Sequence, residues 1–285
     1  MCRKLALAAT TLILGCAAFS VQAVADSAGT SAAAPQPAAS AKPAPARKAT
    51  AAERAAADRL QPLISAAFWV RETDLDPSDI DAAAHLSRAL RAMGQYDEAV
   101  AAAQRALVID PNAYDALMEL ARAQLSKGQG FYAIDPAQHA ARLAPKDWRP
   151  LSLLGVAYTQ VHRDDDAASA WRAALAISPN NPAVLANMAM SLAARGDTAG
   201  AEPLLRTAVA QPSADLTVRQ DLALVLGYEG KLDEAQKLMS ENVPPEQAAA
   251  NMAYLRQVAP GQGAAQAAPA GADPHSWSQV KSAGG

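Results

Sequence analysis

The sequence predicts an all-α protein built as a solenoid of about five helix-turn-helix repeats with flanking helices. The first observation is a 34-residue period, which places Gly94, Gly128, Gly196 and Gly230 on one phase. The second is composition: 51% of residues are hydrophobic, alanine above all, and only 5% are aromatic, which suits close helix packing better than a large sheet. The third is that both ends are rich in Ala, Pro, Ser and Gly, which predicts a disordered N-terminal linker and C-terminal tail.

Each phase of the period carries a residue type that a helical hairpin needs. Glycine ends the first helix of a repeat, because a left-handed C-cap is unfavourable for a residue with a Cβ atom. Alanine lets the second helix pack closely against the first, and proline follows the second helix, which it cannot continue. The alanine phase holds Ala99, Ala133, Ala167, Ala201 and Ala235, and the proline phase holds Pro111, Pro145 and Pro179.

These marks divide the chain into six segments. Residues 1–25 form a signal peptide region, residues 26–49 an Ala/Pro/Ser linker, and residues 50–79 a degenerate leading repeat, whose Pro77 lies 34 residues before Pro111. Residues 80–245 hold repeats 1–5, which begin at Ile80, Tyr114, Trp148, Pro182 and Leu216. Residues 246–259 form a capping helix, because a solenoid end must cover its last apolar surface, and residues 260–285 form the tail.

Three local features carry more detailed predictions. His162 stands where the third repeat should have its turn glycine. Pro136 falls inside the second helix of the second repeat, and because proline suits a first helical turn, that helix is predicted to start near Pro136. Asp97, Asp197 and Asp233 follow the turn glycines, where their side chains could cap the second helices.

The 34-residue spacing of small and aromatic residues resembles the tetratricopeptide repeat (TPR). The third repeat shows the pattern best, with Leu151, Leu154, Gly155, Tyr158, Ala167, Trp171, Ala174 and Pro179. The resemblance implies a concave groove lined by the first helix of each repeat. Carried onto this chain, it implies a peptide-binding surface at Arg88, Arg91, Met118, Arg122, Arg149, Val156, Met190, Leu224 and Tyr228.

The expected groove is arginine-bearing in its N-terminal half and apolar in its C-terminal half. Arginine pairs bidentately with carboxylates, and methionine adapts to varied apolar ligands. We therefore expect the arginines to attract an acidic or C-terminal peptide segment. The alternative is an ordinary solvated helix face that binds no ligand.

The N-terminus predicts export. Arg3 and Lys4 precede an apolar stretch that is too short to span a bilayer. Two cleavage sites compete: Ile13-Leu14-Gly15-Cys16 resembles a lipobox that would lipidate Cys16, and Ala23-Val24-Ala25 would release a soluble protein beginning at Asp26. The only other cysteine is Cys2, so neither product could form an internal disulfide or a cysteine-based metal site.

No residue pattern in the sequence predicts catalysis, a metal site or a cofactor. The four histidines lie in separate repeats or in the tail, and no phosphate-binding loop or nucleophile motif occurs. The acidic run Asp164-Asp165-Asp166 precedes a predicted helix, where carboxylates favour the helix dipole. A net charge of −3 argues against nucleic acid as a partner.

The C-terminal block resembles one TPR family. The residues are Gly230-Lys231-Leu232-Asp233-Glu234-Ala235, Val243-Pro244-Pro245-Glu246-Gln247 and Asn251-Met252-Ala253-Tyr254-Leu255-Arg256. They are similar to the end of the TadD family of tight-adherence (Flp) pilus assembly lipoproteins, and Asn242-Val243 and Met252 depart from the usual residues. The resemblance implies a non-catalytic scaffold, an outer-membrane lipoprotein facing the periplasm that serves as pilotin or assembly factor for the pilus secretin, and it favours lipidation of Cys16. The alternative is a soluble periplasmic TPR scaffold for another envelope complex.

Overall fold

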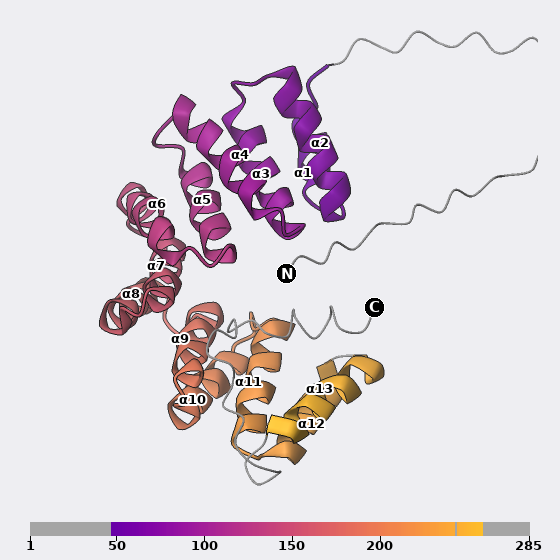
Figure 1. Ribbon diagram of the computed structural model, residues 1–285, viewed down its shortest axis with the longest axis vertical. Coiled ribbons are helices and arrows are strands. Elements are labelled where there is room, and N and C mark those ends of the chain that lie inside the picture. Colours follow the sequence, from indigo (N-terminus) through magenta and orange to yellow (C-terminus); the bar gives the residue numbers. More distant parts are fainter. Residues whose placement is uncertain (1–46, 243, 259–285) are drawn as a thin grey trace, which may run out of the picture. The chain divides into compact units, whose positions relative to one another are not determined.

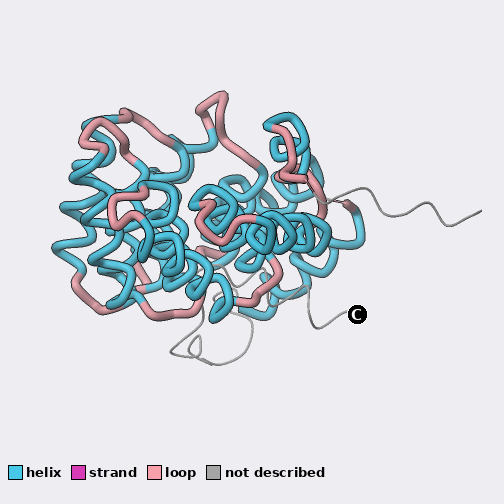
Figure 2. The backbone as a smooth tube through the Cα atoms, turned by 90° about the horizontal axis from the view of Figure 1, so that it is seen from above, coloured by secondary structure: helices cyan, strands magenta, loops and turns pink. Residues whose placement is uncertain are grey.

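The computed structural model describes residues 47–242 and 244–258 of the chain. The predicted signal peptide, Cys16, most of the predicted linker and the predicted tail lie outside these residues. In the described part every regular element is an α-helix (Figure 2). The helices are α1 (Ala51–Ala57), α2 (Pro62–Leu75), α3 (Ile80–Ala92), α4 (Tyr96–Ile109), α5 (Tyr114–Ser126), α6 (Gly130–Leu143), α7 (Arg149–Gln160), α8 (Asp164–Ile177), α9 (Pro182–Ala194), α10 (Thr198–Val209), α11 (Leu216–Tyr228), α12 (Leu232–Asn242) and α13 (Pro245–Val258).

The helices form consecutive hairpins in the predicted register. Helices α3, α5, α9 and α11 begin at the residues expected to open repeats 1, 2, 4 and 5, and α7 begins one residue after Trp148. Consecutive helices pack side by side, and the first helix of each repeat also packs against the first helix of the next (Figure 1). The predicted all-α solenoid is confirmed.

The turn inside every repeat has the same backbone geometry. Gly94, Gly128, Gly196 and Gly230 have φ between 76° and 85°, and His162 takes the same left-handed conformation with φ of 59°. The following N–H donates to a carbonyl five residues back, at 2.8 to 3.0 Å in all five turns. This bond satisfies a carbonyl that the helix end leaves free. The third repeat therefore keeps the turn without the glycine.

The predicted caps are only partly correct. Asp197 caps α10, because its side chain accepts a hydrogen bond of 2.8 Å from the Gly200 N–H. Asp97 and Asp233 instead lie inside the first turns of α4 and α12, where a carboxylate interacts favourably with the positive end of the helix dipole.

The predicted late start of the second helix in repeat 2 is wrong. Helix α6 begins at Gly130 and contains Pro136 in its interior. Pro136 lies on the buried face with Ala133 and Ala137, so packing of this face holds the helix together through the proline. The missing N–H leaves the carbonyl of Tyr132 without its helical donor.

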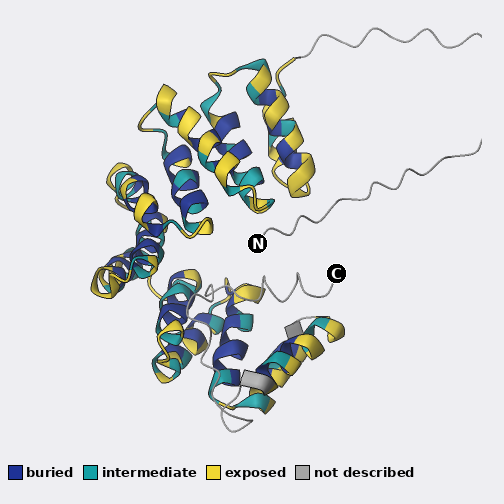
Figure 3. Cartoon of the chain, in the orientation of Figure 1, coloured by how far each residue is buried: buried dark blue, intermediate teal, exposed yellow. Residues whose placement is uncertain are grey.

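Alanine forms the contact between the two helices of each repeat. The five alanines of the 34-residue phase are at most 1% exposed. In repeat 3 the contact is tighter still, because a Cβ atom on Gly155 would lie 2.2 Å from the indole nitrogen of Trp171. Most second helices, such as α4 and α8, accordingly bury one stripe and expose the opposite one, whereas α11 is buried all round over residues 221–227 (Figure 3).

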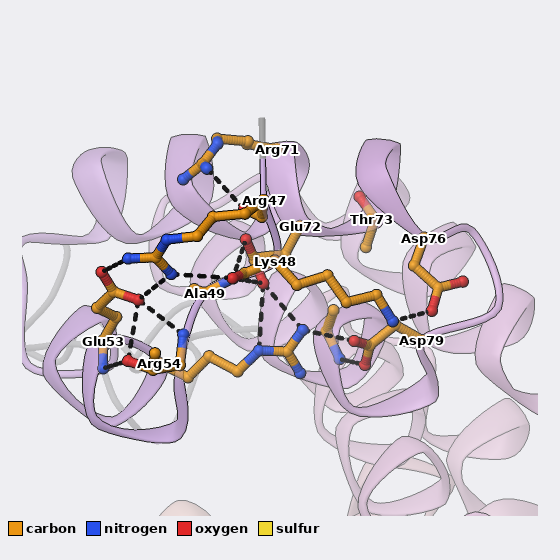
Figure 4. Close-up of polar contacts among 12 residues, drawn as sticks. Arg47, Lys48, Ala49, Glu53, Arg54, Arg71, Glu72, Thr73, Asp76 and Asp79 are labelled. Carbon is orange, nitrogen blue, oxygen red and sulfur yellow. Dashed lines mark hydrogen bonds and ion pairs between the residues drawn. The ribbon is translucent and has the colours of Figure 1, made fainter. Parts of the chain in front are cut away.

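Both ends of the described solenoid are covered. Helix α13 packs on α11 and α12 and buries Met252 and Leu255. At the other end, residues 47–49, which the sequence places in the linker, contact α2 (Figure 4). The Ala49 N–H donates to both oxygens of the fully buried Glu72, at 3.0 and 3.1 Å, and Arg54 donates to one of them at 2.9 and 3.2 Å.

Candidate functional site

A cavity of about 370 Å³ opens along the first helices of four consecutive repeats. Helices α3, α5, α7 and α9 supply most of its lining, and one residue each comes from α4 and α8. The lining residues are Arg91, Tyr96, Arg122, Leu125, Ser126, Leu153, Val156, Thr159, Gln160, Trp171, Asn187, Met190 and Ser191. Stacking of equivalent repeat positions explains why one face of the solenoid carries a continuous hollow. We call this cavity the groove.

The structure brings four of the predicted groove residues together. Arg91, Arg122, Val156 and Met190 all line the groove, with the two arginines on α3 and α5 and the apolar pair on α7 and α9. The two arginines lie at the N-terminal end of this cavity, whereas the end expected to be apolar is mixed, with Asn187 and Ser191 beside Met190.

Three of the predicted apolar contacts have little surface for a ligand. Met118 is 1% exposed, Leu224 is 3% exposed, and both belong to clusters of buried core residues. Met190 is 6% exposed and forms part of the groove lining. Tyr228 is half-buried on α11, and its hydroxyl lies 3.3 Å from that of Tyr254 on α13.

Three arginines converge on one buried carboxylate. Arg88 donates to Glu119 at 3.1 Å, Arg91 at 3.4 Å and Arg122 at 2.6 Å. Glu119 is 0% exposed, whereas the arginines are partly exposed. Burial alone raises the pKa of Glu119, but the positive charges of Arg122, Arg91 and Arg88 outweigh it and hold the pKa below its ordinary value. We call these four residues the Arg/Glu cluster, and it carries a formal charge of +2.

The fourth predicted arginine belongs to a separate contact. Arg149 donates to the Asp147 carboxylate from its backbone N–H at 2.9 Å, from Nε at 2.8 Å and from Nη2 at 2.5 Å. Its guanidinium carbon lies 5.8 Å from the centre of the Tyr114 ring. Burial raises the pKa of Asp147, and hydrogen bonds from Arg149 and Tyr114 more than reverse this and lower it to about 2. Since its charge is neutralised locally, Arg149 adds little to the field of the groove.

Sequence reasoning missed the sixth position of the repeat. Counted from the repeat starts, this position holds His85, Glu119, Leu153, Asn187 and Asp221. Leu153 and Asn187 line the groove, and Glu119 anchors the Arg/Glu cluster beside it. The signal that could have found Glu119 is its spacing, since Arg122 lies three residues away on the same helix face and Arg88 and Arg91 stand on the preceding repeat.

Asp221 occupies the same position in repeat 5 with different surroundings. It is 4% exposed, and among the described residues no hydrogen bond or ion pair is formed by its carboxylate. Burial, with a smaller contribution from the negative charge of Asp215, raises the pKa of Asp221 to about 7. Glu119 and Asp221 therefore occupy equivalent repeat positions, but only Glu119 has ion-pair partners.

The groove presents charge, apolar surface and hydrogen-bonding groups in one cavity. The cationic end comes from Arg91 and Arg122, while Thr159, Asn187 and Ser191 supply side-chain donors and acceptors. Across the described residues, no group of three or more His, Cys, Asp or Glu side chains is placed to hold a metal ion. None of the helices described is both long and apolar enough to cross a membrane.

Comparison with known proteins identifies the repeat. Residues 80–123 match the family described as tetratricopeptide repeat. The structure is similar to that of TTC0263, a thermophilic TPR protein of Thermus thermophilus, with 25% sequence identity and a TM-score of 0.55 over 62% of this chain and 98% of that one. A further match is MamA of Desulfovibrio magneticus RS-1, with 20% identity and a TM-score of 0.46 over 52% of this chain and 84% of that one. A search of curated proteins finds no match.

Proposed function

Since the chain is a tetratricopeptide-repeat protein, we propose that it is an interaction scaffold whose groove binds an acidic segment of a protein partner. TPR proteins generally serve as non-catalytic scaffolds for other proteins. The observation that carries the proposal is the groove itself, which spans four repeats and has two arginines of a cluster with formal charge +2 at one end.

The charge of the Arg/Glu cluster explains the preference for an acidic ligand. One buried carboxylate is shared by three guanidinium groups, so donor capacity and positive charge remain for a second carboxylate. Arg91 and Arg122 belong to the cluster and line the groove, so a carboxylate in the cavity would lie against them. Leu153 and Val156, which are only partly buried, would then contact apolar side chains of the same segment.

The proposal is best tested by a substitution that blocks the groove and leaves the Arg/Glu cluster intact. Reversing the charge of Arg122 would confront the buried Glu119 with a second negative group, so lost binding could not be separated from unfolding. Ser126 is exposed at the end of α5 and lines the groove, so Ser126→Trp would fill the cavity mouth. Gln104→Trp is the matched control, because Gln104 is exposed on α4 and outside the groove lining.

The readout is selection from a phage-displayed library of random peptides of about twelve residues. The wild-type protein and Gln104→Trp should enrich peptides containing Asp or Glu, and Ser126→Trp should enrich none of them. Enrichment that survives in Ser126→Trp, or that ignores acidic residues, would show that the groove does not bind in this way.

A more specific role is proposed from the C-terminal block. Its resemblance to TadD supports an outer-membrane lipoprotein that assists assembly of a Flp pilus secretin, anchored through Cys16. Labelling with a radioactive fatty acid should mark the wild-type protein and leave Cys16→Ser unlabelled and soluble in the periplasm. An unlabelled wild-type protein that begins at Asp26 would favour the soluble periplasmic scaffold instead.

The pilus role has a separate test in the native host. Deletion of the gene should lower the amount of assembled secretin multimer in the outer membrane, and the wild-type gene should restore it. Normal secretin assembly after deletion would reject the pilotin role and leave the scaffold proposal to the peptide selection.

A further inference from the structure

The sixth repeat position carries an acid in repeat 2 and in repeat 5, and the neighbours of the two acids differ. Glu119 is surrounded by Arg88, Arg91 and Arg122. Three repeats later, the residues equivalent to these arginines are Met190, Ala193 and Leu224. All three are buried or partly buried members of the apolar core of repeats 4 and 5. The chain therefore supplies three cations to the first acid and none at the equivalent positions around the second.

An unpaired buried carboxylate is unfavourable unless something binds it. Asp221 is 4% exposed and has no hydrogen-bond or ion-pair partner among the described residues. The Asp221 oxygens keep only a small contact with water, and removing most of a carboxylate's hydration without a compensating partner costs free energy. An apolar residue at this position would be compatible with the surrounding core, as Leu153 is at the equivalent position of repeat 3.

No residue of α11 lines the groove, but repeat equivalence places Asp221 on the side of α11 that continues the groove face. The equivalent residues Leu153 and Asn187 both line the groove on α7 and α9, and α11 packs directly against α9. Stacked repeats place equivalent positions side by side, so Asp221 continues the row beyond the groove lining. A ligand that extends from the groove toward the C-terminal end would pass this carboxylate.

We propose that Asp221 binds a basic side chain of the partner segment, so that the groove recognises an acidic residue at the Arg/Glu cluster and a lysine or arginine three repeats further on. A basic side chain supplies the positive charge that Arg88, Arg91 and Arg122 supply to Glu119. The raised pKa of Asp221 agrees with this, because a bound cation would restore the charged form that burial disfavours. A divalent metal is a poorer ligand, since among the described residues no cluster of three potential ligands surrounds this site.

The inference rests on the proposed function, and the same peptide selection tests it independently. Wild type, Asp221→Asn and Asp233→Asn would each be used to select from the random library. Asparagine keeps the size of the Asp221 side chain and replaces its charged carboxylate by a neutral amide. Asp233→Asn is the matched control, because Asp233 is exposed in the first turn of α12 and lies outside the groove lining.

Wild type and Asp233→Asn should enrich Lys or Arg at a fixed distance from the enriched acidic residue, and Asp221→Asn should retain only the acidic preference. A selected peptide should bind Asp221→Asn at least about tenfold more weakly, since one partner of a buried charge pair is lost. Replacing its basic residue by norleucine should weaken binding to wild type and leave binding to Asp221→Asn unchanged.

The outcomes separate the two proposals. Acidic enrichment without a basic position, or a basic position that survives in Asp221→Asn, would overturn the inference and leave the scaffold proposal standing. The absence of any enriched peptide would overturn both.

Discussion

Asp221→Asn is expected to stabilise the C-terminal repeats, by an amount that grows with pH. The folded pKa of Asp221 is about 7, against an ordinary value of 3.8. Below the ordinary pKa the carboxyl is neutral in both states, so its burial adds no charge penalty. Between the two pKa values the unfolded chain loses its proton first, and stability falls by about 1.4 kcal/mol per pH unit. Above the folded pKa the full penalty, about 4 kcal/mol, acts on the wild type and is absent from the asparagine variant.

The equivalent substitution in repeat 2 should have the opposite sign. Glu119→Gln leaves three arginines converging on an uncharged group, which should lower the free energy of unfolding by about 2 kcal/mol, because water screens part of their charge. The pKa of Glu119 is lowered, so this loss should be the same at about pH 8 and at about pH 5. Urea unfolding followed by far-UV circular dichroism at these two pH values measures both variants. An Asp221→Asn variant that is no more stable than wild type at about pH 8 would refute the assignment of Asp221 as a buried, unpaired acid.

Substitutions at three further sites test a turn, a helix contact and an ion pair. His162→Val should lower stability by about 1–2 kcal/mol, because a β-branched residue is strained at a φ of 59°, whereas His162→Asn should be neutral in the same urea titration. Gly155→Ala should cost about 1–3 kcal/mol, since its Cβ atom would overlap the Trp171 ring, and a fully stable variant would show that the ring moves aside. Arg54→Met should cost about 3 kcal/mol by leaving Glu72 buried without its cation, and an equal thermal midpoint for variant and wild type would contradict this.

The fold could be predicted from the sequence because each mark of the period serves a local requirement. The glycine phase fixes a left-handed turn and the alanine phase a close helix contact, and both requirements recur in every repeat. The prediction failed at Pro136. The rule that proline begins a helix did not hold there, because α6 has a buried face that is continuous on both sides of the proline. Contacts between helices decided that case, and a single sequence does not contain them.

The candidate site was less accessible to the same reasoning. Repeat phase alone placed Met118 and Leu224 on the binding face, but their exposure depends on how far the next repeat covers them, and both are buried. The repeat position of a residue also could not show that three arginines share Glu119, because charged residues at equivalent positions of neighbouring repeats need not be in contact.

The period nevertheless contains the information that distinguishes the two acids. At the sixth position, Glu119 has arginine at three neighbouring repeat positions, and Asp221 has Met190, Ala193 and Leu224 at the same three. The repeats can therefore be compared with one another, since each has the same backbone arrangement with different side chains at equivalent positions. Where the chain provides a charge and its neutralising partners in one repeat, and the charge without the partners in another, the second is the place to look for a ligand. On this ground Asp221 stands apart from the other acids of the described solenoid.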